Sequence, residues 1–443
     1  MVLLAAFGIA SAADLPQFDD ASYKALVDTS SSATAPPGTT ITMQNWQQYK
    51  QFMPLGLQLL FSGDYYWKMP QDVEIDVGPT IPIPLPKLYL QNAEKYASQV
   101  SLVKTPNGGY MTKNYVAGLP FPNLDPKDPL LAYKIMYNEY EHYICHVHYN
   151  DDAVFTKDRF SNVQSQELYT VYRRLTHLSS PGVPIIDPKN DGYDMVQYIE
   201  VLAPEQSRYS TTIKTFSDDP TVLENIFSYT PSLRRAIRLS SQSRCAPATG
   251  GDNVFDDTRS GFGIHPVDFS ARNLGEKKIL LLEHVDTGRV TEPALHSFSL
   301  YESNMYEPLL FPKPTYGKWE IRNEYIQDYR MLPAAGSDSY CYGSRLVYLD
   351  AESYMQFAVD LYDIGLKYWK YDTNFFRPEV IPNTGGDVEV GDDPGVQAIW
   401  DFQNNHLTST LQAITQCDSE VDPKYRDNVE RYGWPSGLDQ ITQ

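Results

Sequence analysis

Positive charge is scarce in this sequence. The 443 residues include 36 lysines and arginines against 56 aspartates and glutamates, which gives a formal net charge of −20. Proteins that bind nucleic acids or anionic membrane surfaces neutralise phosphate groups with a basic face. The deficit therefore excludes a dedicated nucleic-acid-binding protein, and it argues against docking on an anionic lipid surface.

Long apolar segments are missing as well. No run approaches the roughly 20 apolar residues of a membrane-spanning helix. At the N-terminus, a short apolar run from Val2 to Ile9 precedes Ala10-Ser11-Ala12, a pattern typical of a signal-peptidase site, although no lysine or arginine precedes the run. We therefore expect residues 1–12 to be a signal peptide without its basic region. The mature chain is then exported, soluble and not an integral membrane protein.

Cysteine is rare, and the four cysteines are far apart. No two are spaced as CxxC, which disfavours a zinc tetrathiolate site and a thioredoxin-like motif. In an oxidising compartment the even number permits two disulfides. Three pairings are possible among these residues, and the sequence leaves all three open: Cys145, Cys245, Cys341 and Cys417.

Motifs of nucleophilic catalysis are also missing, since the chain contains no GxSxG, SxxK or HExxH. The glycine-rich segment Thr249–Asn253 lacks the Lys-Ser/Thr of a phosphate-binding loop, and we interpret it as a turn. We predict no catalytic residue and no cofactor. Because acidic residues are so common here, a carboxylate pair carries little information about hydrolysis. A hydrolase that uses Asp or Glu on a hydrophobic or glycan substrate is one alternative.

What the chain does contain is tyrosine and proline, with 33 and 32 residues. Tyrosine favours strands, and its apolar ring ends in one polar atom. Five prolines between residues 70 and 90 exclude a central strand or helix there and predict an extended segment. The composition predicts a mainly β protein with proline-punctuated loops.

Alternation of apolar and polar residues indicates the strands. The clearest ones form an antiparallel meander with one apolar and one charged face, with turns at Asp350–Glu352 and Asp363–Gly365. Strands are predicted over residues 133–149, 193–202, 276–284, 317–332, 340–349, 353–363 and 366–372, and helices over 52–61, 92–102 and 396–414.

Three histidines lie close together in the first predicted strand. His142, His146 and His148 would share one face, and imidazoles two residues apart on a strand can bind zinc or copper. A polar strand face that happens to carry histidines is the more frequent outcome for so short a motif. We therefore predict no metal site and keep these histidines as an alternative.

A local basic run contains Arg234, Arg235 and Arg238. Guanidinium groups can hold a phosphate or carboxylate head group by bidentate contacts. Such runs more often pair with nearby acids, and the candidates here are Asp252, Asp256 and Asp257. We expect the three arginines to form a structural cluster.

Several segments together resemble one family. They are NYVAGLPFP (114–122), PSLRRAIRL (231–239), GGDNVFDD (250–257), GFG (261–263) and a C-terminal block between residues 317 and 371 that includes GKWEIRNEYIQD and FAVDLYDIGLKYWKY. The chain thus resembles the Gram-negative periplasmic domain-of-unknown-function 1329 family, whose members are often labelled outer-membrane lipoprotein-sorting proteins. The likeness covers roughly residues 50–375.

The resemblance implies a mainly β (α+β) fold like that of the periplasmic lipoprotein carriers: a strongly curved antiparallel sheet, or incomplete β-barrel, with helices covering its mouth. It further implies a periplasmic carrier or chaperone for a hydrophobic or lipid-like molecule, working beside an inner-membrane transporter of the resistance-nodulation-division type. It carries over no catalytic residue. We divide the chain into a polar leader (13–45), a curved-sheet domain (46–375) and a C-terminal loop, helix and tail packed on that domain (376–443).

The apolar face of the meander is the predicted ligand site. Side chains on one face of a curved sheet form an apolar cavity, and tyrosine hydroxyls can meet the polar part of an amphipathic ligand. An ordinary packed core, or an adaptor with no ligand, would use the same pattern. The predicted cavity wall consists of Trp319, Ile321, Tyr325, Met355, Phe357 and Val359.

Overall fold

The structure is a computed structural model. It describes residues 14–19, 21, 34–258, 263, 265–285, 304–375, 377–389 and 395–441. The signal peptide predicted for residues 1–12 lies outside the described residues. Within them, no helix has the length and apolar character needed to cross a membrane.

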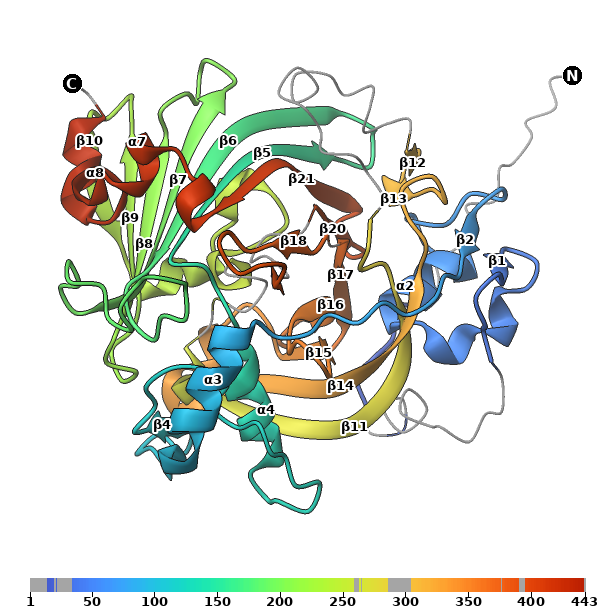
Figure 1. Ribbon diagram of the computed structural model, residues 1–443. Coiled ribbons are helices and arrows are strands. Elements are labelled where there is room, and N and C mark those ends of the chain that lie inside the picture. The colour runs from blue at the N-terminus through green and yellow to red at the C-terminus, as the bar shows by residue number, and fades with distance from the viewer. Residues whose placement is uncertain are drawn as a thin grey trace, which may run out of the picture.

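One curved antiparallel sheet of thirteen strands organises the chain (Figure 1). The predicted fold class, a mainly β protein built on a curved antiparallel sheet, is confirmed. In spatial order the strands are β10 (Arg235–Leu239), β9 (Asn225–Thr230), β8 (Thr211–Ser217), β7 (Tyr193–Ala203), β6 (Val163–Arg174), β5 (Val147–Lys157), β21 (His406–Cys417), β20 (Val396–Asp401), β17 (Tyr368–Phe375), β16 (Gln356–Tyr362), β15 (Ser344–Asp350), β14 (Glu320–Met331) and β11 (Phe269–Leu281).

Smaller elements surround this sheet. The helices are α2 (Leu55–Ser62), α3 (Lys87–Tyr96), α4 (Leu131–Tyr140), α7 (Pro423–Arg426) and α8 (Val429–Tyr432). Short strand pairs are β1 (Thr40–Thr42) with β2 (Glu74–Asp76), β3 (Ser101–Lys104) with β4 (Tyr110–Lys113), β12 (Met305–Tyr306) with β13 (Phe311–Pro312), and β18 (Glu379–Val380) with β19 (Val388–Glu389).

The predicted meander is confirmed as β14 to β17, which are neighbours in chain order. Two other predictions are wrong. Residues 131–140 form α4 and the strand begins only at Val147, because Ile135, Met136 and Glu139 recur at helical spacing and are all buried. The predicted helix 92–102 is shifted, since α3 begins after Pro86 and the chain is a strand again from Ser101.

The predicted C-terminal helix 396–414 is also wrong. The segment forms β20 and β21, which lie between β17 and β5 in the middle of the sheet. Their turn follows Asp401, whose carboxylate accepts the backbone N–H groups of Gln403 and Asn404. Residues 396–401 and 406–417 therefore belong to the large sheet itself.

The two faces of the sheet carry different partners. One face packs against α2 through a core that contains Leu60, Phe61 and Tyr371, and we call it the α2 face. The other packs against α4 through Ile135 and Val347, and we call it the α4 face. Close packing at the α2 face is shown by Gly56, where an added Cβ would lie 2.1 Å from the ring of Tyr371.

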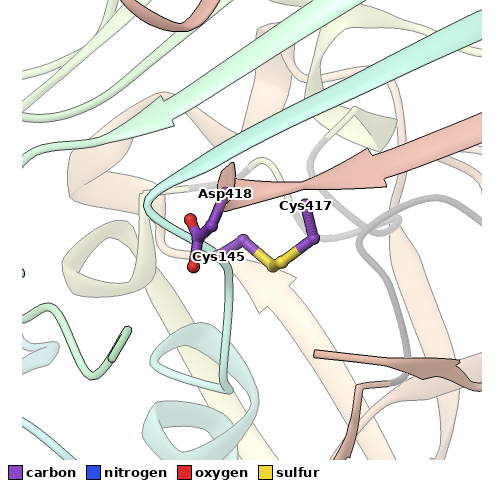
Figure 2. A group of neighbouring side chains, drawn as sticks. All are labelled: Cys145, Cys417 and Asp418. Carbon is purple, nitrogen blue, oxygen red and sulfur yellow. A yellow bond between two sulfur atoms is a disulfide. The ribbon is translucent and has the colours of Figure 1, made fainter. Parts of the chain in front are cut away.

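Two disulfides fasten distant segments. Cys145 pairs with Cys417 and Cys245 with Cys341, with Cα–Cα distances of 5.9 and 5.4 Å. The structure thereby selects one of the three pairings that the sequence leaves open. Figure 2 shows the first bond, which joins the segment before β5 to the end of its neighbour β21.

Candidate functional site

Residues 241–258 and 265–268 fill the α4 face, and we call them the filling segment. This segment contains the short 3-10 helices Ser241–Cys245, Ala248–Gly250, Phe255–Asp257 and Pro266–Asp268. Three of its acids meet partners on the sheet or within the segment. Asp257 faces Arg345 at 2.8 Å, Asp256 faces Arg244 at 3.0 Å, and Asp252 faces His406 at 2.7 Å. A polar network therefore covers the α4 face of the sheet.

The pairing predicted for the basic run is wrong. Arg234, Arg235 and Arg238 are exposed on the β9–β10 hairpin, and the acids they were expected to meet pair with Arg244, Arg345 and His406. Arg238 donates to Asn225 on the neighbouring strand. The hairpin register places these arginines at the open edge of the sheet, which local sequence spacing does not reveal.

The six residues of the predicted cavity wall do not share one face. Trp319, Met355 and Phe357 are buried in the core of the α2 face, and Ile321 packs against it; Val359 is buried in the core of the α4 face, and Tyr325 packs against that core. Among the cavities described, Met355 borders one of about 20 Å³. A bulge beside Gln356 shifts the alternation within β16, so Phe357 and Val359 face opposite sides.

The three histidines of the alternative metal site are also separated. His142 follows α4, and its Nδ1 lies 2.5 Å from the Glu139 carbonyl oxygen. His146 Nε2 lies 2.6 Å from Asp187 Oδ2, while His148 is in β5 beside the ring of Tyr172. In the described parts of the chain, no cluster of three possible metal ligands includes them. The single strand face on which they were predicted does not exist.

Two other clusters of ligand-type side chains are present. The first, Cys145, Cys417 and Asp418, has both sulfurs in a disulfide, so neither is available as a thiolate ligand (Figure 2). The second consists of Glu283, Glu324 and Asp350 and is fully buried. Sequence alternation predicted one charged face for this strand but gave no sign that it is buried; Glu320, Arg322 and Glu324 are all at most 3% exposed.

An apolar pocket of about 740 Å³ lies between α3, β3 and the loop that precedes α4. We call it the α3–α4 pocket. This volume falls within the roughly 300–1,000 Å³ of typical small-molecule sites. Leu90, at its mouth, is 39% exposed. The apolar lining includes Leu90, Ala93, Val100, Leu102, Phe121 and Leu130.

The GLPFP segment positions this pocket. Gly118 has a φ of 81°, and a Cβ there would lie 2.3 Å from Ala93 N and 2.6 Å from Tyr89 O, so glycine allows the loop to touch α3. The Asn138 side chain of α4 both accepts from Phe121 N and donates to Phe121 O, each at 2.9 Å. Loop and helices therefore form one unit at the end of the sheet (Figure 1).

One ion pair stands at the polar side of the pocket. Lys134 Nζ lies 2.5 Å from Asp128 Oδ2 and 5.5 Å from the centre of the Phe121 ring. The hydrogen bond from Lys134 lowers the pKa of Asp128. The pocket thus combines an apolar lining with one lysine and two acids, Glu94 and Asp128, a mixture suited to an amphipathic ligand.

A second cavity, of about 160 Å³, is lined mainly by polar side chains, among them Tyr115, Glu141, His177, Asp194 and His265. It is too small for a lipid chain. Glu139, on the buried side of α4 nearby in sequence, accepts from Tyr329 Oη at 2.9 Å, and burial raises its pKa to about 8.

The family model described as "Protein of unknown function (DUF1329)" matches residues 40–432. The chain belongs to this family. The resemblance drawn from the sequence segments is thereby confirmed, and the matched region of the DUF1329 chain spans the α3–α4 pocket and every strand of the large sheet.

Solved structures resemble the DUF1329 chain at low identity. An outer membrane lipoprotein-sorting protein domain from Vibrio parahaemolyticus is 11% identical with a TM-score of 0.43, covering 67% of this chain and 96% of that one. A DUF1329 family protein from Desulfovibrio piger is 11% identical with a TM-score of 0.44, covering 69% and 99%. A LolA superfamily protein from Nitrosomonas europaea is 9% identical with a TM-score of 0.39, covering 66% and 96%. No curated protein matches the chain.

Proposed function

We propose that this DUF1329 protein is a periplasmic carrier or chaperone for an amphipathic, lipid-like molecule, and that the α3–α4 pocket binds the apolar part of this ligand. The observation that carries the proposal is the pocket itself: about 740 Å³ of apolar-lined space that opens beside a single ion pair. Because a polar network already covers the α4 face, we place the ligand in the α3–α4 pocket and not against the sheet.

The free energy gained by burying methylene groups indicates how long the apolar part of the ligand must be. Each buried methylene contributes about 0.8 kcal/mol, so ten of them contribute roughly 8 kcal/mol. Association costs at least about 4 kcal/mol in lost freedom of motion. A long alkyl chain therefore binds, and a short one does not. Affinity should rise steadily with chain length until the pocket is full.

Location and partner remain predictions. The periplasm follows from the signal peptide expected at residues 1–12. The inner-membrane transporter of the resistance-nodulation-division type follows from the family resemblance, and no observation on the described residues bears on it. Neither is needed for the pocket to bind its ligand.

The test is to recover the ligand and block the site. The chain is purified from the periplasm of a Gram-negative host, extracted with organic solvent and examined by mass spectrometry; in parallel, a lipophilic fluorophore is displaced by fatty acids of increasing length. Ala97→Trp fills the pocket from its half-buried lining, whereas Gln91→Trp places the same ring on the exposed side of α3 outside the lining.

We expect a co-purifying lipid, tighter binding of longer chains, and loss of binding in Ala97→Trp alone. Circular dichroism and melting temperature establish that both variants are folded. If the wild type neither carries a lipid nor binds the fluorophore, the proposal is wrong. Equal binding by both tryptophan variants would place the ligand elsewhere and is equally decisive against this pocket.

A further inference from the structure

Three buried carboxylates converge where β11, β14 and β15 meet. Glu283 follows β11, Glu324 lies on β14, and Asp350 ends β15 directly opposite Glu324 in the strand register. One oxygen of each side chain lies within 4.8 Å of the others. All three residues are at most 2% exposed, so water does not screen their mutual repulsion.

Positive charge at this cluster is insufficient. Arg322 Nε lies 2.5 Å from Glu283 and 2.8 Å from Asp350, and its Nη1 lies 3.2 Å from a fourth buried acid, Glu320. His284 contacts the other oxygen of Glu320 at 2.5 Å. Across the strand from Glu324, the register places Lys277. Four buried carboxylates therefore face two permanent cations, Arg322 and Lys277. This excess of buried acid has a desolvation cost that further positive charge or bound protons would relieve.

Glu324 is the unusual member. Its side chain is 0% exposed, and neither carboxylate oxygen has a hydrogen-bond partner. A buried ionised group without a partner costs several kcal/mol. Because one of its oxygens lies within 4.8 Å of oxygens of Glu283 and Asp350, the carboxylate points into the cluster. A cation bound at this position would interact with the two Glu324 oxygens that accept no hydrogen bond.

We propose that Glu283, Glu324 and Asp350 bind a divalent cation of the calcium type. Three oxygens that are at most 4.8 Å apart lie within about 2.8 Å of a common centre, close to the roughly 2.3–2.6 Å of calcium–oxygen bonds. An all-oxygen set selects hard cations over zinc or copper. This site is separate from the α3–α4 pocket and does not rest on the carrier function.

The segment 78–83 packs beside the cluster through Glu320, Arg322 and Glu352. Ile81 N donates to Glu320 Oε2 at 2.8 Å, and Ile83 N donates to Glu352 Oε2 at 2.8 Å. Arg322 Nη1 in turn donates to Ile81 O at 2.6 Å. A cation that binds the folded chain alone stabilises it by mass action, so calcium should raise the melting temperature of the whole chain.

Bound protons are the competing explanation. Burial raises the pKa of Glu283 and Glu324 well above the ordinary range of a carboxylic acid, so neutral side chains would also relieve the repulsion. The two explanations differ in their response to metal. A cation site responds to calcium at constant pH, whereas a protonated cluster responds to pH alone.

The experiment uses the full chain after EDTA treatment and desalting, titrated with CaCl2 at pH 7.5 by calorimetry and melted with calcium or EDTA. We expect one calcium per chain, a higher melting temperature with calcium, and weaker binding of magnesium. Glu324→Gln keeps the shape and should weaken binding by roughly tenfold or more. Glu276→Gln, exposed on β11, is the matched control and should bind as the wild type does.

Glu283→Gln is the second variant if Glu324→Gln does not fold. The proposal is overturned if the wild type binds no calcium, magnesium or manganese at millimolar concentration. It is equally overturned if the folded glutamine variant binds calcium as the wild type does. Identical melting temperatures in calcium and EDTA, with stability that rises only on acidification, would assign protons to the cluster and reject the cation.

Discussion

Arg345 Nη2 lies 2.8 Å from Asp257 Oδ1 beneath the segment that fills the α4 face, and neither side chain is more than 2% exposed. Asp257 comes from this segment and Arg345 from β15, so the pair joins the filling segment to the sheet. Tyr342 Oη donates to the other oxygen of Asp257 at 2.8 Å. The contact explains why the GGDNVFDD stretch has a structural role rather than a phosphate-binding one.

Asp257→Asn should destabilise the chain strongly. The substitution keeps the shape but removes the carboxylate that Arg345 faces, and breaking a buried ion pair typically costs about 3–5 kcal/mol. Urea unfolding followed by tryptophan fluorescence measures the change. The exposed Asp338→Asn is the control and should change stability by less than about 0.5 kcal/mol. Equal stability of the two variants would contradict the structural role of the pair.

Gly118→Ala should cost both stability and ligand binding. The new methyl would meet α3 at 2.3 Å in a backbone with φ of 81°, and relief of the clash must move the loop away from α3. Gly108→Ala is the matched control, because its φ is 97° but nothing lies within 4 Å of an added Cβ. We expect unfolding free energies to separate the variants by about 2 kcal/mol. Similar losses would mean that backbone strain alone matters.

Titration of Glu139 should lower the free energy of unfolding as the pH rises. Its pKa is about 8 when folded and 4.5 ordinarily, so the folded chain binds more protons between these values. The contribution to stability is complete below about pH 4.5, declines by at most about 1.4 kcal/mol per pH unit, and is lost once the pH passes 8.

Glu139→Gln removes this titration. Its stability relative to the wild type should therefore improve steadily from pH 5 to 8, measured by urea unfolding at several pH values. Glu94→Gln, exposed on α3, should follow the wild-type profile throughout. Parallel profiles for Glu139→Gln and the wild type would show that the buried carboxyl does not hold its proton.

Lys134→Met should change ligand preference if the α3–α4 pocket is the binding site. The ammonium group at the pocket favours an anionic head group, so affinity for a fatty acid should fall several-fold, while a fatty alcohol of equal chain length should bind as before. Fluorophore displacement measures both. Lys127→Met, exposed and outside the lining, is the control. An equal loss for acid and alcohol would indicate damage to the pocket rather than loss of charge.

Periodicity predicted the meander correctly because every strand from β14 to β17 is bounded by recognisable turns. The same reasoning failed for α4, where Tyr133, Ile135 and Tyr137 alternate while also fitting a helical turn. It failed again at β20 and β21, where Asp401 supplies a turn through its side chain rather than through glycine or proline. Local patterns cannot distinguish these cases, since the deciding contacts come from distant strands.

Composition, alternation and motifs are local properties, and they were enough to predict the family, the curved antiparallel fold class and the segments that carry the family likeness. Which side chains meet depends on contacts between distant segments, and these are seen in the folded chain alone. The tertiary structure paired Asp257 with Arg345, joined the cysteines, and turned Glu320, Arg322 and Glu324 into the interior. A strand pattern defines two faces without saying what covers each one. The packing of residues 78–83, 241–258 and 265–268 determines what covers each face, and we therefore propose the pocket beside α3 as the ligand site.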